Sequence, residues 1–527
     1  MATSELEREV KLEVDGSFEV PELPGAAAGF APGRSPDVRL AARYFDTADL
    51  RLLRRGISLR HRRDLSGDGE DGWTLKLPAR TDRAVLARRE LAWPGGLDRE
   101  PSEALALVRG IVRRAPLALA ALLRSERRRL VLVDPSGAPM AELDDDTVTV
   151  VRGARQGLTF RQIEVEQLGA DDALFEELVA RLTAAGARRG RQEPKLLRAV
   201  GPPPEPLRPQ DLGPASNLGQ VVVAAVAAGA GRLLDHDVGI RLGDGDTEFV
   251  HQARVATRRL RSDLRTFRGV LDPSWVDGIR AELQWLGGAL GAVRDADVLG
   301  ANLQDLDERA GGGDEAGFGE IMAALRLQRD DADSTLREAL DSDRYLDLLD
   351  RLEDAVGHPP FVGRSGPLDP GLPAADVLPG LLRGPWRRLR KAAVGAGRRP
   401  DDAQLHRVRI RAKQLRYAAE AAAPVFGSRA RQLAQGAEAL QTVLGEQHDA
   451  VTAAAWLSET GATGSPTRAV AARRLAEQAR RRQEDRRAAW RPAWRRFDRV
   501  AVARWLEGVG PEPVPPTPRP GDSASVS

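Results

Sequence analysis

The stretch ELEREVKLEV, residues 5–14, places Glu7, Glu9 and Lys11 at every second position, with Val10 and Leu12 between them. Because side chains alternate between the two faces of a β-strand, this spacing predicts a strand with one charged and one apolar face. Carboxylates beside an ammonium group could bind a metal ion together with an anionic substrate. A half-buried strand whose charged face meets water has the same pattern.

Four further segments, ISLRHRR, WTLKL, AELDDDTV and QIEVEQ, repeat this alternation. Their charged faces carry Arg60, Arg62, Lys76, Glu142, Asp144, Asp146, Glu164 and Glu166. If these strands form one antiparallel sheet that closes with helices on its apolar side, both signs of charge line the lumen of a barrel. Basic groups there would bind the oxygens of a condensed phosphate, and the carboxylates would hold Mg²⁺ or Mn²⁺ for phosphoryl transfer.

Composition limits the class of protein. A chain of 527 residues suggests roughly two to four domains. Hydrophobic residues make up 42% and charged residues 30%, and cysteine is absent, which excludes disulfides and thiolate metal sites. We expect neither a membrane span nor a secretory signal, because no run of eighteen apolar residues occurs and the N-terminal segment is acidic. The net charge is only +2, and five of the 79 basic residues are lysine.

The pattern changes along the chain and predicts an α+β protein. Residues 1–200 are rich in strand-like segments, and residues 201–216 form a Pro-rich stretch that we expect to be a linker. Residues 217–508 consist of Ala-, Leu- and Arg-rich segments with helical periodicity. The last segment, 509–527, has too few apolar residues to fold and is predicted to be a disordered tail.

The first part of the chain resembles the CYTH superfamily, the triphosphate tunnel metalloenzymes. EREVK is similar to the ExExK motif of that family, and RYFDTADLRLLRRGISLRHRR, WTLKLP, RRELAWP, RSERRRL, AELDDDTV, IEVEQL and EPKLLRAV follow in the family's order. The similarity covers residues 3–200 and implies an eight-stranded antiparallel β-barrel, or tunnel. Pro194, before Lys195, departs from the serine that is usual in the family.

The CYTH resemblance also implies roles for individual residues. The catalytic group would comprise Glu7, Glu9 and Lys11. The phosphate-binding group would comprise Lys11, Arg60, Arg62, Lys76, Arg89, Arg124, Arg127 and Lys195. The ligands of Mg²⁺ or Mn²⁺ would be Glu7, Glu9, Asp144, Glu164 and Glu166.

The helical part contains the segment HQARVATRRLRSDLRTF. Counted from His251 at 100° per residue, Arg254, Arg258, Arg261 and Arg265 fall within about an 80° stripe of a helix. Like charges at this spacing repel one another by roughly 0.2–0.5 kcal/mol per pair. Helix stability therefore does not explain the row, whereas an anionic partner would.

The same pattern returns in HRVRIRAKQLRY, where His406, Arg409, Lys413 and Arg416 match His251, Arg254, Arg258 and Arg261. LGAVRDADVL likewise returns as LGEQHDAVTA, which pairs Asp295 with Asp449 and Arg294 with His448. This repetition predicts two duplicated four-helix bundles, about 217–355 and 373–508, whose basic ridges face each other across a groove.

This part resembles the CHAD family, whose members bind inorganic polyphosphate. The resemblance covers about residues 215–508 and implies a polyphosphate site formed by His251, Arg254, Arg258, Arg261, His406, Arg409, Lys413 and Arg416. For the two histidines, a capping or packing role stays open beside phosphate contact. We expect Asp295 and Asp449 to orient the arginines rather than to bind metal.

Together these patterns predict a cytoplasmic phosphohydrolase, associated with polyphosphate granules. Its CYTH part would hydrolyse inorganic triphosphate or polyphosphate with Mg²⁺ or Mn²⁺, and its CHAD part would hold the polymer. A non-catalytic polyphosphate-binding scaffold protein and a nucleotide-acting CYTH enzyme are the alternatives, because class IV adenylate cyclases share the CYTH barrel. Nucleic acid is not the expected partner, because the basic ridges lack interleaved aromatic residues and tunnel carboxylates would repel a polynucleotide.

Overall fold

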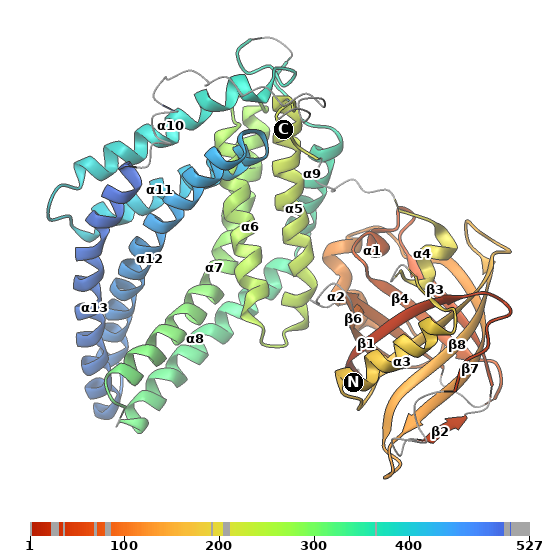
Figure 1. Cartoon of the computed structure of the whole chain (residues 1–527). Helices are drawn as coiled ribbons and strands as arrows, with labels where there is room; N and C mark the ends of the chain where they lie inside the picture. The colour runs from red at the N-terminus through yellow and green to blue at the C-terminus, as the bar shows by residue number, and fades with distance from the viewer. Residues whose placement is uncertain are drawn as a thin grey trace, which may run out of the picture. The chain divides into compact units, whose positions relative to one another are not determined.

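The computed structural model describes residues 3–22, 31–34, 37–67, 71–78, 86–190, 193–203, 211–312, 314–363, 366–499 and 506, and leaves aside the side chains of 3–7, 31–34, 86–88 and 499. The chain divides into two compact units, Met1–Glu205 and Pro206–Ser527 (Figure 1). The first contains an antiparallel sheet and the second is helical, which confirms the predicted α+β class. The predicted tail at 509–527 lies outside the described residues.

The strands of the first unit are β1 (Thr3–Val14), β2 (Ala31–Arg34), β3 (Val38–Asp46), β4 (Ser58–Asp64), β5 (Asp71–Pro78), β6 (Leu86–Pro94), β7 (Ala118–Val133), β8 (Pro139–Arg152), β9 (Thr159–Gln167) and β10 (Arg188–Arg189). They pair in the order β10-β1-β6-β5-β4-β3-β7-β8-β9, and β2 pairs with β7. β1 pairs with β6 along its first half and with β9 along its second half. The last strand in this order, β9, therefore pairs with β1 as well as with β8.

Apolar side chains cover one face of this sheet and are packed by helices. Val10 and Leu12 of β1 form a buried cluster with Phe175 and Val179 of α3 (Asp172–Ala184), the helix that Figure 1 shows across the strands. On β6, Trp93 donates a hydrogen bond to Glu103 of α2 (Ser102–Val112). The opposite face, called the charged face below, carries the polar residues of the alternating strands.

Two short helices complete the first unit. α1 (Arg51–Arg54) follows β3, and α4 (Lys195–Val200) ends the unit. Leu196 of α4 packs with Leu123 and Val148, which share a face with the charged residues further along β7 and β8. This packing brings Lys195, the first residue of α4, against the charged face.

The helices of the second unit are α5 (Leu218–Leu242), α6 (Thr247–Thr266), α7 (Pro273–Arg309), α8 (Glu315–Asp341), α9 (Asp343–Gly357), α10 (Ala374–Gly395), α11 (Asp402–Phe426), α12 (Ser428–Ala462) and α13 (Pro466–Arg499). The order α5 to α8 returns as α10 to α13, with the basic stripe on α6 and again on α11. Carboxylates fix where both of these helices begin, because Asp246 caps α6 and Asp401 forms a capping box at α11.

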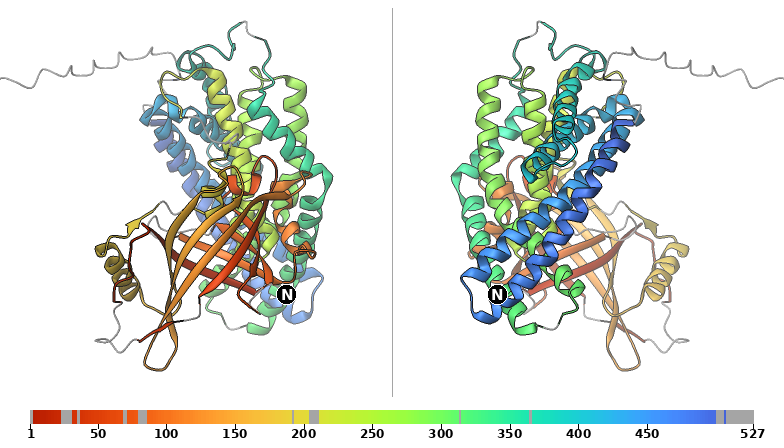
Figure 2. Two further views of the ribbon diagram at one scale, coloured as in Figure 1. Left: turned by 90° about the vertical axis from the view of Figure 1, so that its right-hand side faces the viewer. Right: turned by 90° about the vertical axis from the view of Figure 1, so that its left-hand side faces the viewer.

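The two repeats, predicted as four-helix bundles that face each other, share their hydrophobic cores. One hydrophobic core joins both repeats, for example Leu260 of α6 and Leu415 of α11. A second core contains Leu303 of α7 and Leu457 of α12, together with residues of α8 and α13. The reason is length: α7 and α12 have 37 and 35 residues, so each runs about 50 Å and passes beyond the first core. Figure 2 shows α12 and α13 lying side by side.

Helix α5 is long and apolar enough to cross a membrane by length and composition alone. Its side chains nevertheless belong to the first core, where Leu218, Val221, Val222 and Leu233 are buried. A core helix of this composition meets the same criterion, and the packing of α5 identifies it as one.

Candidate functional site

Charged side chains of neighbouring strands stand directly opposite one another on the charged face. Glu9 of β1 is in register with Glu166 of β9, which is in register with Glu142 of β8. The next row along the strands consists of Lys11, Glu164, Asp144 and Arg129. Opposite residues in an antiparallel pair have Cβ atoms about 5 Å apart. The sheet therefore gathers acidic and basic groups into adjacent rows.

Two lysines link the carboxylates of this face. Lys11 Nζ lies 3.1 Å from Glu9 Oε1 and 3.0 Å from Glu164 Oε1. Lys195 Nζ donates to Glu164 Oε2 at 2.9 Å and to Asp146. Burial alone would raise the pKa of Glu164, but the charges of Lys11 and Lys195 hold it well below its usual value. The carboxylate is therefore ionised at neutral pH.

Arg127 of β7 extends the network. Its Nε and Nη2 donate to the two carboxylate oxygens of Asp146 at 2.8 and 2.7 Å, and it also contacts Asp144. Asp146 is fully buried, yet the charges of Lys195 and Arg127 outweigh that burial and lower its pKa. The neighbouring Arg129 Nη2 lies 2.8 Å from Glu142.

A second group of basic residues surrounds Glu90 on β6. Lys76 Nζ lies 2.7 Å and Arg60 Nη2 lies 3.6 Å from the Glu90 carboxylate. Burial would raise the pKa of Glu90, but the charges of Arg60, Lys76 and Arg62 lower it to about 2. Three basic residues predicted to bind phosphate thus converge on one carboxylate.

Arg89 and Arg124 do not join the other predicted phosphate ligands. Arg89 is in register with Leu77, so it lies on the opposite face from its neighbour Glu90. Arg124 is three positions from Arg127 on β7, and it is exposed. An odd spacing along a strand places two side chains on opposite faces, which is the physical reason for this correction.

The predicted metal ligands Glu9, Asp144, Glu164 and Glu166 share the charged face, whereas the Glu7 side chain lies outside the described residues. No group of three or more acidic or imidazole side chains is arranged to hold a metal ion in the described part of the chain. The donor chemistry nevertheless suits Mg²⁺ or Mn²⁺, because all four side chains offer carboxylate oxygens. Burial and the nearby charge of Asp144 raise the pKa of Glu142. A divalent cation would relieve this repulsion, so the residues fit such a group.

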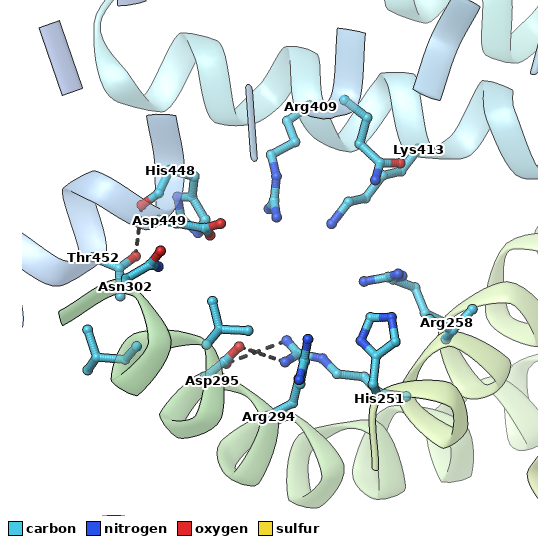
Figure 3. A pocket seen from close by; sticks show the side chains of 15 residues that line it. His251, Arg258, Arg294, Asp295, Asn302, Arg409, Lys413, His448, Asp449 and Thr452 are labelled. Atoms are coloured by element: carbon cyan, nitrogen blue, oxygen red, sulfur yellow. Dashed lines mark hydrogen bonds and ion pairs between the residues drawn. The ribbon is translucent and has the colours of Figure 1, made fainter. Parts of the chain in front are cut away.

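A pocket of about 480 Å³ opens in the helical unit between α6 and α7 on one side and α11 and α12 on the other. Its basic lining consists of His251, Arg254, Arg258, Arg294, Arg409, Lys413 and His448. Figure 3 shows Arg409 and Lys413 extending toward Arg258 and His251 across the pocket. The two basic stripes thus meet at this pocket.

Contacts inside the pocket hold two of the arginines in place. Arg254 Nη1 lies 2.6 Å from Asp295 Oδ1 and donates to the Gly291 carbonyl at 3.2 Å. Arg258 Nε donates to the hydroxyl of Tyr417 at 2.8 Å. Asp295 therefore orients an arginine, as the sequence analysis anticipated. Asp449 also lines the pocket, where burial raises its pKa.

The basic side chains of the pocket repel one another, because the lining holds fewer acidic than basic groups. Burial and the charges of Arg258, Arg409 and Arg254 lower the pKa of Lys413 to about 7. The rings of His406 and His448 lie 4.7 Å apart, and burial and Arg409 lower the pKa of His448 to about 4. Burial also lowers the pKa of His406. The histidines are therefore neutral at pH 7, where each can donate only one hydrogen bond.

Arg261 and Arg416 belong to the predicted set but do not line the pocket. Arg261 Nη2 donates to Gln284 Oε1 at 2.9 Å. Arg416 Nε donates to Glu420 at 2.7 Å, and its Nη2 lies 2.9 Å from Glu438. His406 does not line the pocket either, although its ring lies 4.7 Å from that of His448, which does.

The sequence analysis missed several residues of both sites. Counting by twos along β7 from Arg127 would have added Arg129 to the charged face. Asp146 was placed on that face but was given no role in the site. The repeat offered a further signal, because His448 and Arg294 occupy equivalent positions and both line the pocket. Tyr417, which follows Arg416, had no signal of its own.

Comparison with known proteins agrees with this division. Residues 5–198 match the model of the CYTH domain, and residues 224–458 match that of the CHAD domain. The uncharacterized protein Rv2226 of Mycobacterium tuberculosis is 33% identical over 478 residues, which cover 85% of this chain and 87% of that protein.

Two solved structures resemble parts of the chain. PptA from Streptomyces chartreusis is 26% identical with a TM-score of 0.43, and the match covers 53% of this chain and all of that one. The CHAD domain from the plant Ricinus communis is 26% identical with a TM-score of 0.44, and the match covers 58% of this chain and 96% of that one. On its domain matches and its mycobacterial relative, the chain belongs to the family of proteins in which a CYTH domain is followed by a CHAD domain.

Proposed function

We propose that the CYTH domain is a tunnel-shaped phosphohydrolase that cleaves inorganic triphosphate or polyphosphate, and that the CHAD domain binds inorganic polyphosphate. The observation that carries the first part is the pairing of opposite charges on one sheet face, with Lys11 between Glu9 and Glu164 and with Lys76 against Glu90. Such a face offers cations to phosphate oxygens and carboxylates to a divalent metal.

In this proposal the residues of the charged face divide into two roles. Arg60, Arg62 and Lys76 hold the oxygens of the phosphate chain, and the entering anion replaces Glu90 as their partner. Glu9, Glu164, Glu166 and Asp144 would hold Mg²⁺ or Mn²⁺, which neutralises charge on the phosphoryl oxygens and activates water when it is bound. The ammonium groups of Lys11 and Lys195 now pair with Glu164. When substrate and metal bind, these two groups would contact phosphate oxygens instead.

The CHAD pocket supports binding without cleavage. Arg258, Arg409 and Lys413 face a shared space, and repulsion among their charges is relieved when a polyanion enters. The acidic side chains of the pocket lining are Asp295 and Asp449, and Asp295 is engaged by Arg254. The pocket would thus retain a polymer for the CYTH domain, and we propose a cytoplasmic location at polyphosphate stores.

Substrate choice is tested by measuring phosphate release by the full chain from triphosphate, long-chain polyphosphate, ATP and thiamine triphosphate with Mg²⁺ and with Mn²⁺. We expect the inorganic substrates to be cleaved fastest. A preference for ATP would favour a nucleotide-acting enzyme. Binding of polyphosphate without release of phosphate from any of the four would identify a scaffold protein. The ion pairs that engage the carboxylates of the charged face favour this alternative.

Changing Lys76 to Ala should weaken the interaction with triphosphate. A charge-assisted contact contributes about 1.5–3 kcal/mol, so we expect KM for triphosphate to rise roughly 10- to 150-fold. Glu90 keeps Arg60 as a partner, so the fold should persist. Arg63→Ala is the matched control, because Arg63 is an exposed neighbour of Arg62 on the opposite face of β4. Wild-type kinetics in Lys76→Ala would count against the tunnel.

Binding of polyphosphate should tighten as the pH falls from about 9 to about 7. Lys413 has a pKa of about 7 in the free protein, so it is mostly neutral above that pH. A bound polyanion favours the charged form, and each complex then takes up a proton. The dissociation constant should change by up to about tenfold per pH unit above pH 7.

Titration calorimetry in two buffers with different heats of ionisation measures that proton uptake. Lys413→Arg should bind polyphosphate with little pH dependence in this range, because arginine stays charged. A pH-independent wild type would show that Lys413 does not meet the ligand.

A further inference from the structure

A second group of basic side chains lies on α6, α7, α10 and α11 outside the pocket. We call it the distal arginine cluster, and it consists of Arg261, Arg265, Arg280, Arg388 and Arg411. Burial and the charges of Arg280, Arg411, Arg261 and Arg388 together lower the pKa of Arg265. The charge of Arg280 likewise lowers the pKa of Arg261, and that of Arg411 lowers the pKa of Arg388. Arg261 also reaches Gln284, which lies one helical turn beyond Arg280 on α7.

The partners of these arginines within the fold are few and mostly neutral. Arg261 and Arg411 each donate to a glutamine, Gln284 and Gln414, at 2.9 Å. Arg280 reaches Asp277 only at 3.7 Å, and that carboxylate already accepts a hydrogen bond from Arg268 at 2.6 Å. Among the described residues, no hydrogen bond or ion pair engages Arg265 or Arg388.

Other exposed arginines of the helical unit show what an ordinary solvated surface looks like here. Arg481 pairs with Glu477 and Arg337 pairs with Asp333, in each case one helical turn away. In the distal arginine cluster, repulsion between like charges is left largely uncompensated. Repulsion between like charges lowers the stability of the fold, so stability does not explain this arrangement. An anionic ligand would make it favourable.

The position of the cluster indicates which kind of ligand it would bind. Arg265 continues the stripe of α6 that supplies Arg254 and Arg258 to the pocket, and it lies seven residues beyond Arg258. Two turns of helix amount to about 10 Å, with Arg261 in between. A linear polyanion that leaves the pocket along α6 therefore meets the distal arginine cluster next.

We propose that the distal arginine cluster is a second binding site for inorganic polyphosphate, engaged only by chains too long for the pocket. This inference rests on the proposed function of the pocket. The residues of the cluster carry guanidinium groups, which bind phosphate oxygens bidentately.

The test compares the full chain with the variant Arg265→Gln, Arg388→Gln and Arg411→Gln at several salt concentrations. The probes are polyphosphates of about ten and about a hundred phosphates, because the salt slope counts the charges engaged. We expect the variant to bind the short chain within twofold of wild type and the long chain at least about tenfold more weakly. The slope of log K against log salt for the long chain should fall by about 2.

A matched variant, Arg326→Gln, Arg473→Gln and Arg480→Gln, removes three exposed charges elsewhere on α8 and α13 and should bind both chains as wild type does. Undiminished long-chain binding by the cluster variant would overturn the inference, and so would an equal loss for short and long chains. An equal loss of affinity for single-stranded DNA would show a general anion surface instead. Failure of wild type to bind the short chain would contradict the proposed function of the pocket itself.

Discussion

The variant Glu9→Gln should fold normally and lose about a hundredfold or more in turnover of inorganic triphosphate with Mg²⁺ or Mn²⁺. Glu9 is 2% exposed, and its carboxylate lies 3.1 Å from the ammonium group of Lys11. Glu9 itself stands in one row with Glu166 and Glu142. Glutamine keeps the shape of the side chain but removes the charge that a divalent cation requires. Lys11 keeps Glu164 as a partner at 3.0 Å, so no charge is stranded.

Phosphate release and thermal unfolding, measured on the same preparations, test this expectation. Glu126→Gln is the matched control, because Glu126 is an exposed carboxylate of β7 that lies on the opposite face from Arg127. The control should keep the wild-type rate. Unchanged activity in Glu9→Gln, with an unchanged requirement for metal, would contradict the assignment of the charged face as the metal site.

The second large effect concerns the pocket of the CHAD domain. Replacing Arg254, Arg258, Arg409 and Lys413 together by Ala should weaken the binding of polyphosphate about a thousandfold or more, since four charge-assisted contacts are removed. Wild-type binding should weaken steeply with salt, and the variant should show a much smaller slope. Fluorescence anisotropy with labelled polyphosphate measures both quantities.

Stability should not account for this loss. The four residues repel one another in the free protein, and alanine is the best helix former, so the variant should unfold at or above the wild-type temperature. Hydrolysis of triphosphate should persist, because these residues belong to the helical unit. Undiminished binding by the variant would show that the stripes are solvated faces. Wild-type binding of DNA as tight as that of polyphosphate at physiological salt would contradict the choice of ligand.

The sequence predicts the charged face well, because the direction of a side chain on a strand is a local property. Glu9, Lys11 and Lys76 were assigned by their period of two, and register brings them onto the same face. Arg89 and Arg124 came from motif resemblance alone, and strand parity places both on the other face. Motif resemblance carries no information about strand parity, whereas the period of two does.

The helical unit shows the limit of the same reasoning. A period of 3.6 identifies which face of a helix is buried, and it placed Arg254 and Arg258 together. Periodicity does not identify the partner helix, so the shared cores of the two repeats were not foreseen. The resemblance to the CHAD family also included Arg261 and Arg416 in the site, and these two residues of α6 and α11 do not line the pocket.

The most direct test is the initial rate of orthophosphate release from inorganic triphosphate by the full chain, with Mg²⁺ or Mn²⁺ and with a chelator. The arrangement of Glu9, Lys11, Lys76 and Glu90 predicts release that requires the metal and disappears with the chelator. Binding of triphosphate without any release, with either metal, would contradict a hydrolytic CYTH domain.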